Sequence, residues 1–257
     1  MVRLTSLLTA TLLPGVFARA LIGPELPDGE AESIIKARQG YYFQNWSEGG
    51  SNIRCNNGNG GGFSANWNSK GGFVCGKGWK GSGARYFPFL VNISSSILRI
   101  TPLALPPHHQ TCVFANTPRT IKYTGTYNAT GPGYLAIYGW TRNPLIEYYI
   151  LESHADLAPN EPWTSKGNFT IDEGTFEVYQ STRVNQPSIE GTRTFQQYWS
   201  VRTEKRVGGT VTTKKHFDEW AKRQMRLGSH DYVVMAVEGY TKTGGPGSSG
   251  SASITIQ

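Results

Sequence analysis

The sequence predicts an all-β protein with one helix. Glycine is abundant, at 31 of 257 residues, and Tyr and Trp contribute 13 and 7. Charged residues make up only 17% of the chain, below the quarter that is usual in globular domains. Many short segments alternate between apolar and polar residues and are separated by Gly- and Asn-rich turns, a pattern typical of a sandwich or a curled antiparallel sheet. This composition argues against helical bundles, coiled coils and disordered tails.

The predicted strands follow one another along the chain after residue 40. Each combines β-branched or aromatic residues with an alternation of period two, and turn-forming residues separate it from the next. The Asn- and Gly-rich run at 56–62 is one such turn. In chain order the strands are expected at 41–46, 53–55, 63–67, 71–75, 76–79, 120–127, 134–140, 146–152, 175–183, 192–202, 232–240 and 251–257.

One segment follows a helical period instead. Residues 213–228 place apolar side chains at i, i+3, i+4 and i+8, the spacing of one helical face: Phe217, Trp220, Ala221 and Met225. Thr213 can cap the start of this helix and Gly228 its end. We expect the helix to pack on the outside of a sheet, with its aromatic residues in the core and without a ligand role.

Length and charge limit the partners of the protein. A chain of 257 residues suits one large all-β domain, and no apolar run reaches the 18 residues of a transmembrane helix. The net charge is +7, but the Lys and Arg residues are scattered, which gives little support to a nucleic-acid partner. A basic surface with aromatic residues equally suits a polysaccharide. We expect a monomer that binds neither nucleic acid nor membranes.

The N-terminus has the pattern of a secretory signal peptide at 1–20. Arg3 is followed by a short apolar stretch and by Ala-Arg-Ala at 18–20, which fits the cleavage rule for small residues. A buried N-terminal strand is the alternative. Residues 21–38 are polar and acidic and end in Lys-Ala-Arg, as a propeptide with a basic processing site would. We therefore expect a secreted, extracellular protein whose single domain spans 39–257.

In a secreted protein the cysteines can form disulfides and the sequons can be glycosylated. Disulfides are permitted outside the cell, and N-glycosylation acts on Asn-x-Ser/Thr sites, here Asn45, Asn92, Asn128 and Asn168. Cys55 and Cys75 lie on two predicted strands and could form a bridge between neighbouring strands. Two free core thiols are the alternative, since unpaired Cys is often buried.

Residues 86–119 differ from the rest of the domain. They contain no Gly, Asp, Glu or Lys and are rich in Pro. They include the third cysteine, Cys112, and two consecutive histidines, His108 and His109. If residues 81–85 are joined to 120–123, with either Arg85 or Arg119 kept at the junction, the sequence reads Gly-Ser-Gly-Ala-Arg-Thr-Ile-Lys-Tyr. This is an ordinary turn followed by a strand. We hypothesise that 86–119 is a translated, unspliced intron. A genuine surface insertion is the alternative.

Two glutamates inside predicted strands are candidates for chemistry. Alternate residues share a face, so Glu147 lies on one face with Tyr149, and Glu238 lies on one face with Tyr240. A strand interior is a poor place for a lone Glu, whereas a pair of carboxyls on an aromatic concave face could cleave a glycosidic bond. Two solvent-facing strand glutamates are the alternative. No metal site or cofactor is expected, because the other histidines show no ligand spacing: His154, His216 and His230.

Several motifs together resemble the endo-1,4-β-xylanases of glycoside hydrolase family 11, of the fungal type. They are Asn-Pro-Leu-Ile-Glu-Tyr-Tyr-Ile at 143–150, Val-Glu-Gly-Tyr at 237–240, Gly-Lys-Gly-Trp at 76–79, Val-Asn-Gln-Pro-Ser-Ile at 184–189, Gln-Tyr-Trp-Ser-Val at 197–201 and Gly-Ser-Ala-Ser-Ile at 250–254. The resemblance covers about 41–85 and 120–257. It implies a β-jelly roll of two stacked antiparallel sheets with one helix, and a secreted xylanase whose larger sheet curls around a cleft.

The resemblance also implies roles for the site residues. Glu147 would be the nucleophile and Glu238 the general acid/base of a retaining reaction, whose carboxyls lie ~5–5.5 Å apart. Two carboxyls this close titrate separately, because the charge of one raises the pKa of the other. The substrate-binding residues would be Trp46, which stacks on a xylose ring, Pro187 at the tip of a "thumb" loop, and Tyr138, Tyr149, Arg183, Gln197, Tyr232 and Tyr240.

Two departures and two alternatives accompany this interpretation. Gly72 stands where the family usually has Asp or Asn hydrogen-bonded to the acid/base, so the usual inference of a pH optimum fails. The segment 86–119 interrupts the start of a strand, so we expect low activity with it and normal activity without it.

A non-catalytic xylan-binding module and a related two-sheet endoglucanase are the alternative functions, although Pro-Ser-Ile at 187–189 and the context of Glu147 favour xylan hydrolysis.

Overall fold

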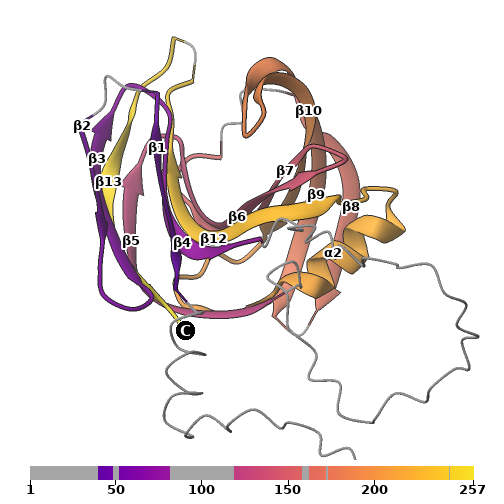
Figure 1. Ribbon diagram of the computed structural model, residues 1–257, viewed down its shortest axis with the longest axis horizontal. Helices are drawn as coiled ribbons and strands as arrows, with labels where there is room; N and C mark the ends of the chain where they lie inside the picture. Colours follow the sequence, from indigo (N-terminus) through magenta and orange to yellow (C-terminus); the bar gives the residue numbers. More distant parts are fainter. Residues whose placement is uncertain (1–39, 49–51, 82–118, 158–161, 172, 243) are drawn as a thin grey trace, which may run out of the picture. The chain divides into compact units, whose positions relative to one another are not determined.

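Two β-sheets and one helix make up the described part of the chain (Figure 1). The computed structural model describes residues 40–48, 52–81, 119–157, 162–171, 173–242 and 244–257. The predicted signal peptide, the predicted propeptide and all but the last residue of 86–119 lie outside these residues, as does Asn92. The expected all-β fold with two sheets and one helix is confirmed.

The larger sheet has eight strands and carries most of the aromatic residues. Its order is β1 (Tyr42–Ser47), β4 (Phe73–Lys80), β12 (Ser229–Gly239), β6 (Gly133–Arg142), β7 (Ile146–His154), β10 (Gly191–Arg202), β9 (Gly174–Ser188) and β8 (Thr164–Ile171). Figure 1 shows that the sheet curls, so that β9 and β10 rise opposite β1 and β4. One face of the sheet is therefore concave.

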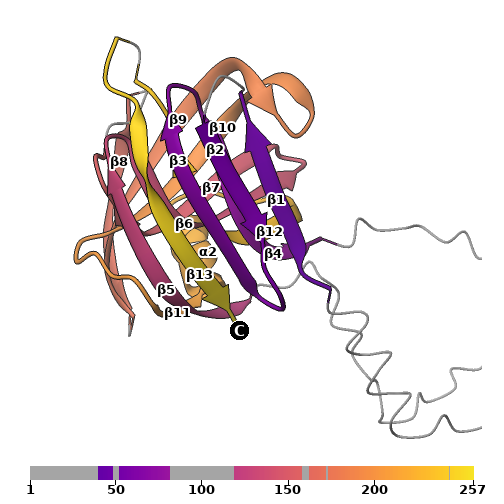
Figure 2. The ribbon, with the colours of Figure 1, turned by 90° about the vertical axis from the view of Figure 1, so that its left-hand side faces the viewer.

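The smaller sheet has five strands and is seen in front in Figure 2. Its order is β11 (Gly209–Thr212), β5 (Thr120–Thr130), β13 (Ser248–Ile256), β3 (Gly62–Ser69) and β2 (Asn52–Asn57). Side chains from the facing strands of the two sheets interdigitate in one apolar core, as alternation with period two requires: they include Phe63, Trp67, Ile121, Ile137, Ile150, Met235 and Ile254.

The sheets differ from the expectation at one strand pair and at two strands. β10 pairs with β7 in parallel, because the chain passes from β7 to the far edge at β8 and returns through β9. The sheets are thus mostly, not wholly, antiparallel. Sequence patterns did not predict β8 or β11: β8 is a polar edge strand with Gly167 in it, and β11 has only 4 residues.

A disulfide links the two sheets. Cys55 of β2 is bonded to Cys75 of β4, with 5.7 Å between their Cα atoms. The pairing was one of the two predicted outcomes, but the bridged strands are not neighbours in one sheet. β2 is the last strand of the smaller sheet, whereas β4 belongs to the larger one. The bond therefore joins the two layers at one edge of the stack.

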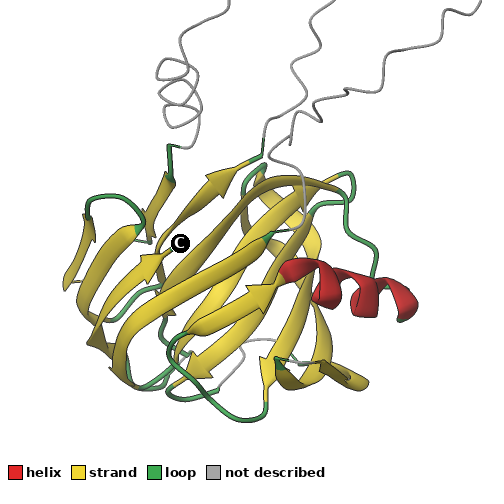
Figure 3. Cartoon of the chain, turned by 90° about the horizontal axis from the view of Figure 1, so that it is seen from below, coloured by secondary structure: helices red, strands yellow, loops and turns green. Residues whose placement is uncertain are grey.

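The helix α2 spans Thr213–Lys222, which is shorter than the predicted segment. It ends early because Gln224 adopts a left-handed φ of 63°. Thr213 does not cap it: its hydroxyl group exchanges hydrogen bonds with the backbone of Arg119 at 2.8 and 3.0 Å. Trp220 and Met225 are buried as expected, whereas Ala221 is exposed. Figure 3 shows α2 on the outside of the sheets, where Trp220 contacts the ring of Tyr148.

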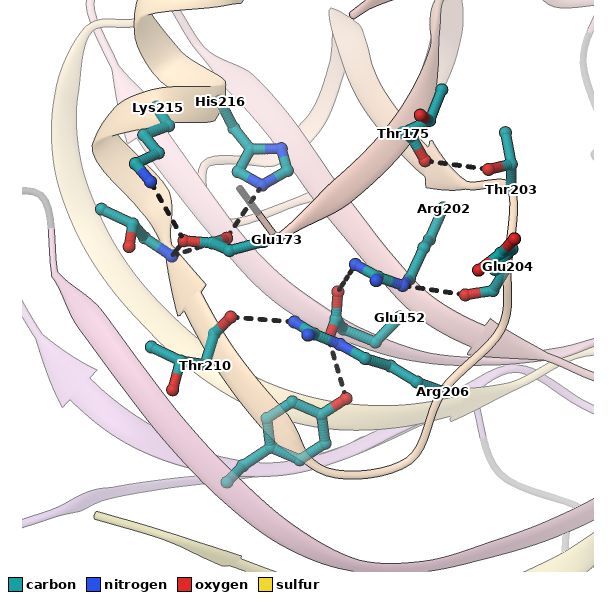
Figure 4. A network of polar contacts seen from close by, with 12 residues as sticks. Glu152, Glu173, Thr175, Arg202, Thr203, Glu204, Arg206, Thr210, Lys215 and His216 are labelled. Atoms are coloured by element: carbon teal, nitrogen blue, oxygen red, sulfur yellow. Dashed lines mark hydrogen bonds and ion pairs between the residues drawn. The ribbon is translucent and has the colours of Figure 1, made fainter. Parts of the chain in front are cut away.

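A buried ionic cluster lies behind the concave face (Figure 4). Glu152 of β7 has the opposite parity to Glu147, and its side chain is fully buried. It accepts hydrogen bonds from Arg206 and from the Tyr123 hydroxyl group, the latter at 2.9 Å, and Arg202 lies 3.7 Å away. The cluster ties β7 to β5 and β10. Burial raises the pKa of Glu152, and the contacts with Arg206 oppose that shift.

Candidate active site

The concave face holds a cleft with a volume of about 450 Å³. All the site residues predicted from the sequence line it: Trp46, Tyr138, Glu147, Tyr149, Arg183, Pro187, Gln197, Tyr232, Glu238 and Tyr240. Other lining residues were not singled out from the sequence, including Glu48, Tyr134, Arg142, Trp163 and Trp199. Alternation places the predicted residues on one face, but only the curl of the sheet brings its distant strands around one cavity.

The two glutamates come from strands that flank β6 in the sheet. Glu147 of β7 pairs with Trp140 of β6 on one side and with Gln197 of β10 on the other. Glu238 of β12 pairs with Val74 of β4 and with Tyr134 of β6. Both carboxyls line the same cleft, as the parity argument predicted.

Glu147 is buried and fully supplied with hydrogen-bond donors. The Tyr138 and Tyr149 hydroxyl groups donate to its Oε1 atom at 2.7 and 3.1 Å, and the Gln197 amide donates to Oε2 at 2.6 Å. Burial raises the pKa of Glu147 overall, and the three hydrogen bonds limit this rise because they favour the ionised form. This side chain is therefore prepared to hold a negative charge.

Glu238 has the contrasting environment. It is partly exposed to the cleft, but its Oε2 atom is buried and has no hydrogen-bond partner among the described residues. Burial and the negative charge of Glu147 raise the pKa of Glu238 to about 8, against opposing contributions from Tyr149 and Arg183. As the pH rises, Glu147 therefore loses its proton before Glu238 does. One carboxylate and one carboxylic acid face the same cavity near neutral pH.

Aromatic rings cover the rest of the concave face. Tyr149 and Trp199 stack with their ring centroids 3.9 Å apart, and Trp163 lies 4.8 Å from Trp199. Trp46 at the other side of the cleft is 41% exposed, unlike almost every other large apolar side chain of the described residues. Flat aromatic surfaces with hydroxyl and indole N–H groups at their edges suit the faces and hydroxyl groups of sugar rings.

The hairpin of β9 and β10 forms one wall of the cleft. Its tip carries Pro187, Ser188 and Ile189, which line the cavity. Arg142 of β6 holds this tip from the opposite side: its guanidinium group is 2.7 Å from Glu190 and 2.9 Å from Asp231. Sequence analysis predicted the thumb but not this ionic contact, which depends on the curl of the sheet.

Neither a metal cluster nor a membrane span is found in the described residues. No group of three or more His, Cys, Asp or Glu side chains there could hold a metal ion. No described helix combines the length and the apolar character needed to cross a bilayer. His216 and His230 are instead packed among aromatic rings, and burial lowers their pKa values to about 3 and about 4.

Comparisons with known proteins agree with this geometry. The family model of the glycosyl hydrolases family 11 matches residues 38–100 and 112–255. The chain is 42% identical to ethylene-inducing xylanase 1 of Verticillium dahliae over 262 residues, with 100% of both chains covered. It is 40% identical to endo-1,4-β-xylanase I of Cochliobolus carbonum, covering 100% of this chain and 99% of that protein.

A solved structure supports the same assignment. An endo-1,4-β-xylanase of Trichoderma reesei superposes with a TM-score of 0.65 at 36% identity, covering 84% of this chain and 97% of that one. The fold is thus the jelly roll that the sequence motifs implied. The chain belongs to family 11 of the glycosyl hydrolases.

Proposed function

We propose that the protein is an endo-1,4-β-xylanase that hydrolyses internal bonds of xylan. The observation that carries this proposal is the unequal pair of carboxyls in an aromatic cleft: Glu147 accepts three hydrogen bonds, and Glu238 has an unpartnered oxygen atom and a pKa raised to about 8. The family relatives, named as xylanases, supply the substrate class.

The proposed reaction retains configuration in two displacements. In the first, a Glu147 oxygen attacks the anomeric carbon while Glu238 donates its proton to the departing glycosidic oxygen, so that a covalent glycosyl-enzyme forms. In the second, Glu238 removes a proton from water, which attacks the same carbon and releases Glu147. The first step needs the protonation states that the two environments favour. In the glycosyl-enzyme Glu147 is an uncharged ester, so its charge no longer raises the pKa of Glu238, and the carboxylate left after proton donation serves as the base of the second step.

The remaining predicted residues would position the xylan chain. Tyr138, Tyr149 and Gln197 orient the nucleophile through the hydrogen bonds described above. Trp46 offers an exposed ring for stacking, and Pro187 contacts the chain from the thumb. Arg183, Tyr232 and Tyr240 line the cleft and would bind sugar hydroxyl groups.

Substitution of each glutamate by glutamine tests this function. Glu147→Gln should reduce sugar release from soluble xylan to background, because amides are poor nucleophiles. Glu238→Gln should lower it by about 10²–10⁴-fold, the usual contribution of a general acid. Undiminished activity in both variants would show that the catalytic assignment is wrong, and xylan binding without hydrolysis by the unaltered protein would identify a binding module. Faster release from carboxymethylcellulose than from xylan would identify an endoglucanase.

We also propose that the protein is exported as a monomer after removal of 1–20 and 21–38. Of its sequons, the described residues Asn45, Asn128 and Asn168 are exposed and therefore accessible to glycosylation. Mass spectrometry of the naturally secreted protein should find an N-terminus at Gln39 and no peptide from the leader. A mature chain that keeps the leader would contradict this processing.

A further inference from the structure

Gly72 leaves the floor of the cleft without a side chain beside the Glu238 carboxyl. Trp46, Val74 and Glu238 pair across β1, β4 and β12 in one row. Because alternate residues share a face, Glu48, Gly72 and Tyr240 form the next row on the same side of the sheet. All three line the cleft. The middle position of this second row is the one that lacks a side chain.

The Glu48 side chain occupies the space over Gly72. Its Oε2 atom accepts a hydrogen bond from the Gly72 amide at 2.9 Å, and the Glu48 amide donates to the Gly72 carbonyl oxygen at 2.9 Å. A Cβ atom at position 72 would lie only 3.2 Å from the carboxyl carbon and from Oε2 of Glu48. A Cβ atom at position 72 would therefore force this carboxylate to shift slightly.

We propose that Glu48 is a positioning residue for the acid/base Glu238. The Glu48 carboxylate lies over Gly72, and its negative charge favours the protonated form of Glu238. This inference rests on the proposed function. The Glu238 Oε2 atom has no hydrogen-bond partner among the described residues, and the hydrogen bond of the carboxyl with Tyr149 is outweighed by burial and the charge of Glu147. Under these conditions a nearby carboxylate acts through its charge.

The other charges around Glu238 are accounted for. Glu48 raises the pKa of Glu238 in the same direction as burial and Glu147, and Arg183 opposes them. Val74 of β4, which pairs with Glu238, and Gly72, which precedes β4, carry no titratable side chain. The other titratable groups near Glu238 are tyrosines, whose own pKa values are raised, so they stay neutral: Tyr127, Tyr134, Tyr138 and Tyr149.

The test is the pH dependence of kcat/KM on soluble xylan, which reports groups of the free enzyme. Glu48→Gln keeps the size of the side chain and removes its charge. Because the Glu48 charge raises the pKa of Glu238, its removal should move the basic limb to lower pH by roughly 0.4–0.8 unit. Gly72→Ala should shift the same limb in the same direction by a smaller amount, since its Cβ forces the Glu48 carboxylate to move slightly.

The double variant distinguishes a shared cause from two separate ones. If both changes act through the Glu48 carboxylate, Glu48→Gln with Gly72→Ala should shift the limb no further than Glu48→Gln alone. Asp218→Asn is the matched control: it removes one charge from an exposed residue of α2 that pairs with Lys214 at 2.7 Å. This control should leave the profile unchanged.

The outcomes separate this inference from the proposed function. An active Glu48→Gln variant whose basic limb coincides with that of the unaltered protein would overturn the role of Glu48 but leave xylan hydrolysis intact. An unaltered protein that releases no sugar from xylan would overturn both. A direct carboxyl NMR titration of Glu238 in the inactive Glu147→Gln variant gives a second readout: there too, loss of the Glu48 charge should lower the Glu238 pKa.

Discussion

At the scale of single residues, the division of labour between the two glutamates follows from their hydrogen bonds. Glu147 is held by three donors that stabilise its charge, whereas for Glu238 burial and the charges of Glu147 and Glu48 outweigh the single hydrogen bond with Tyr149. Hydrogen bonds to a charged group contribute about 1.5–3 kcal/mol each. Removing a donor from Glu147 should therefore change both the rate and the pH at which the nucleophile ionises.

Tyr138→Phe tests this expectation. Losing the 2.7 Å hydrogen bond should raise the pKa of Glu147, so the acidic limb of the kcat/KM profile should move to higher pH. The rate at the optimum should fall by roughly tenfold, in keeping with the loss of about 1.5 kcal/mol. Tyr198→Phe is the control, because Tyr198 lies on the opposite face of β10, where its hydroxyl group donates to the Arg226 carbonyl oxygen at 3.4 Å. An acidic limb that stays in place in Tyr138→Phe would contradict the role of this donor.

Glu152 shows what a buried carboxylate does when it is fully paired. Removing its charge leaves Arg206 and Arg202 without their buried partner (Figure 4), and breaking such a pair costs 3–5 kcal/mol. Because Arg206 is partly exposed, Glu152→Gln should destabilise the protein by about 3 kcal/mol, the lower end of this range. Urea unfolding measures this change. Asp218→Asn, which breaks an exposed pair, should cost under about 1 kcal/mol, and equal losses in the two variants would refute the distinction.

At the scale of elements, the β9–β10 hairpin is the wall of the cleft that an ion pair connects to β6. Its tip is held across the cavity by Arg142, through Glu190 and through the Ile189 carbonyl oxygen. An ion pair that is a third or more exposed contributes at most about 1 kcal/mol. We therefore regard it as a contact that sets how far the tip lies from β6, not as a main source of stability.

Glu190→Gln should loosen this contact and affect substrate binding more than chemistry. We expect KM for xylan to change by up to about fivefold, the equivalent of 1 kcal/mol, with kcat within about twofold. Arg142→Gln and the double variant complete a double-mutant cycle. Glu177→Gln, an exposed change elsewhere on β9, is the control. A fall in kcat with constant KM would show that the contact serves the chemical step instead.

The same scale explains which parts of the fold and site were predictable. Alternating aromatic strands predicted β6, β7, β10 and β12, and with them the face of each glutamate, because alternation is a local property. The polar edge strand β8 has no such pattern. The position of Glu48 in the cleft could not be predicted, because its contact with Gly72 depends on how β1 and β4 pair. The early end of α2 depends on the conformation of Gln224, which no periodicity encodes.

At the scale of the whole molecule, the described ends of the chain around 82–118 lie close together. Gly81 follows β4 and donates a backbone hydrogen bond to Asp231 of β12. The Arg119 guanidinium group lies over the Trp79 ring of β4, 4.6 Å from its centroid. Arg119 also exchanges hydrogen bonds with Thr213. β4 and β5 thus need only a short connection, and all the described strands of the two sheets lie outside 86–119.

This geometry makes the deletion of 86–119 the most informative change to the whole chain. Residues 82–85 would then join Gly81 to Thr120, with Arg85 in the place of Arg119. We propose that the shortened protein folds with the same two sheets and has normal xylanase activity, whereas the full chain has low activity. The measurement is the specific activity of both purified proteins, together with their unfolding midpoints in urea. Equal specific activities, an unfolded deletion variant, or peptides from 86–119 in the naturally secreted protein would each show that the segment is a genuine part of the domain.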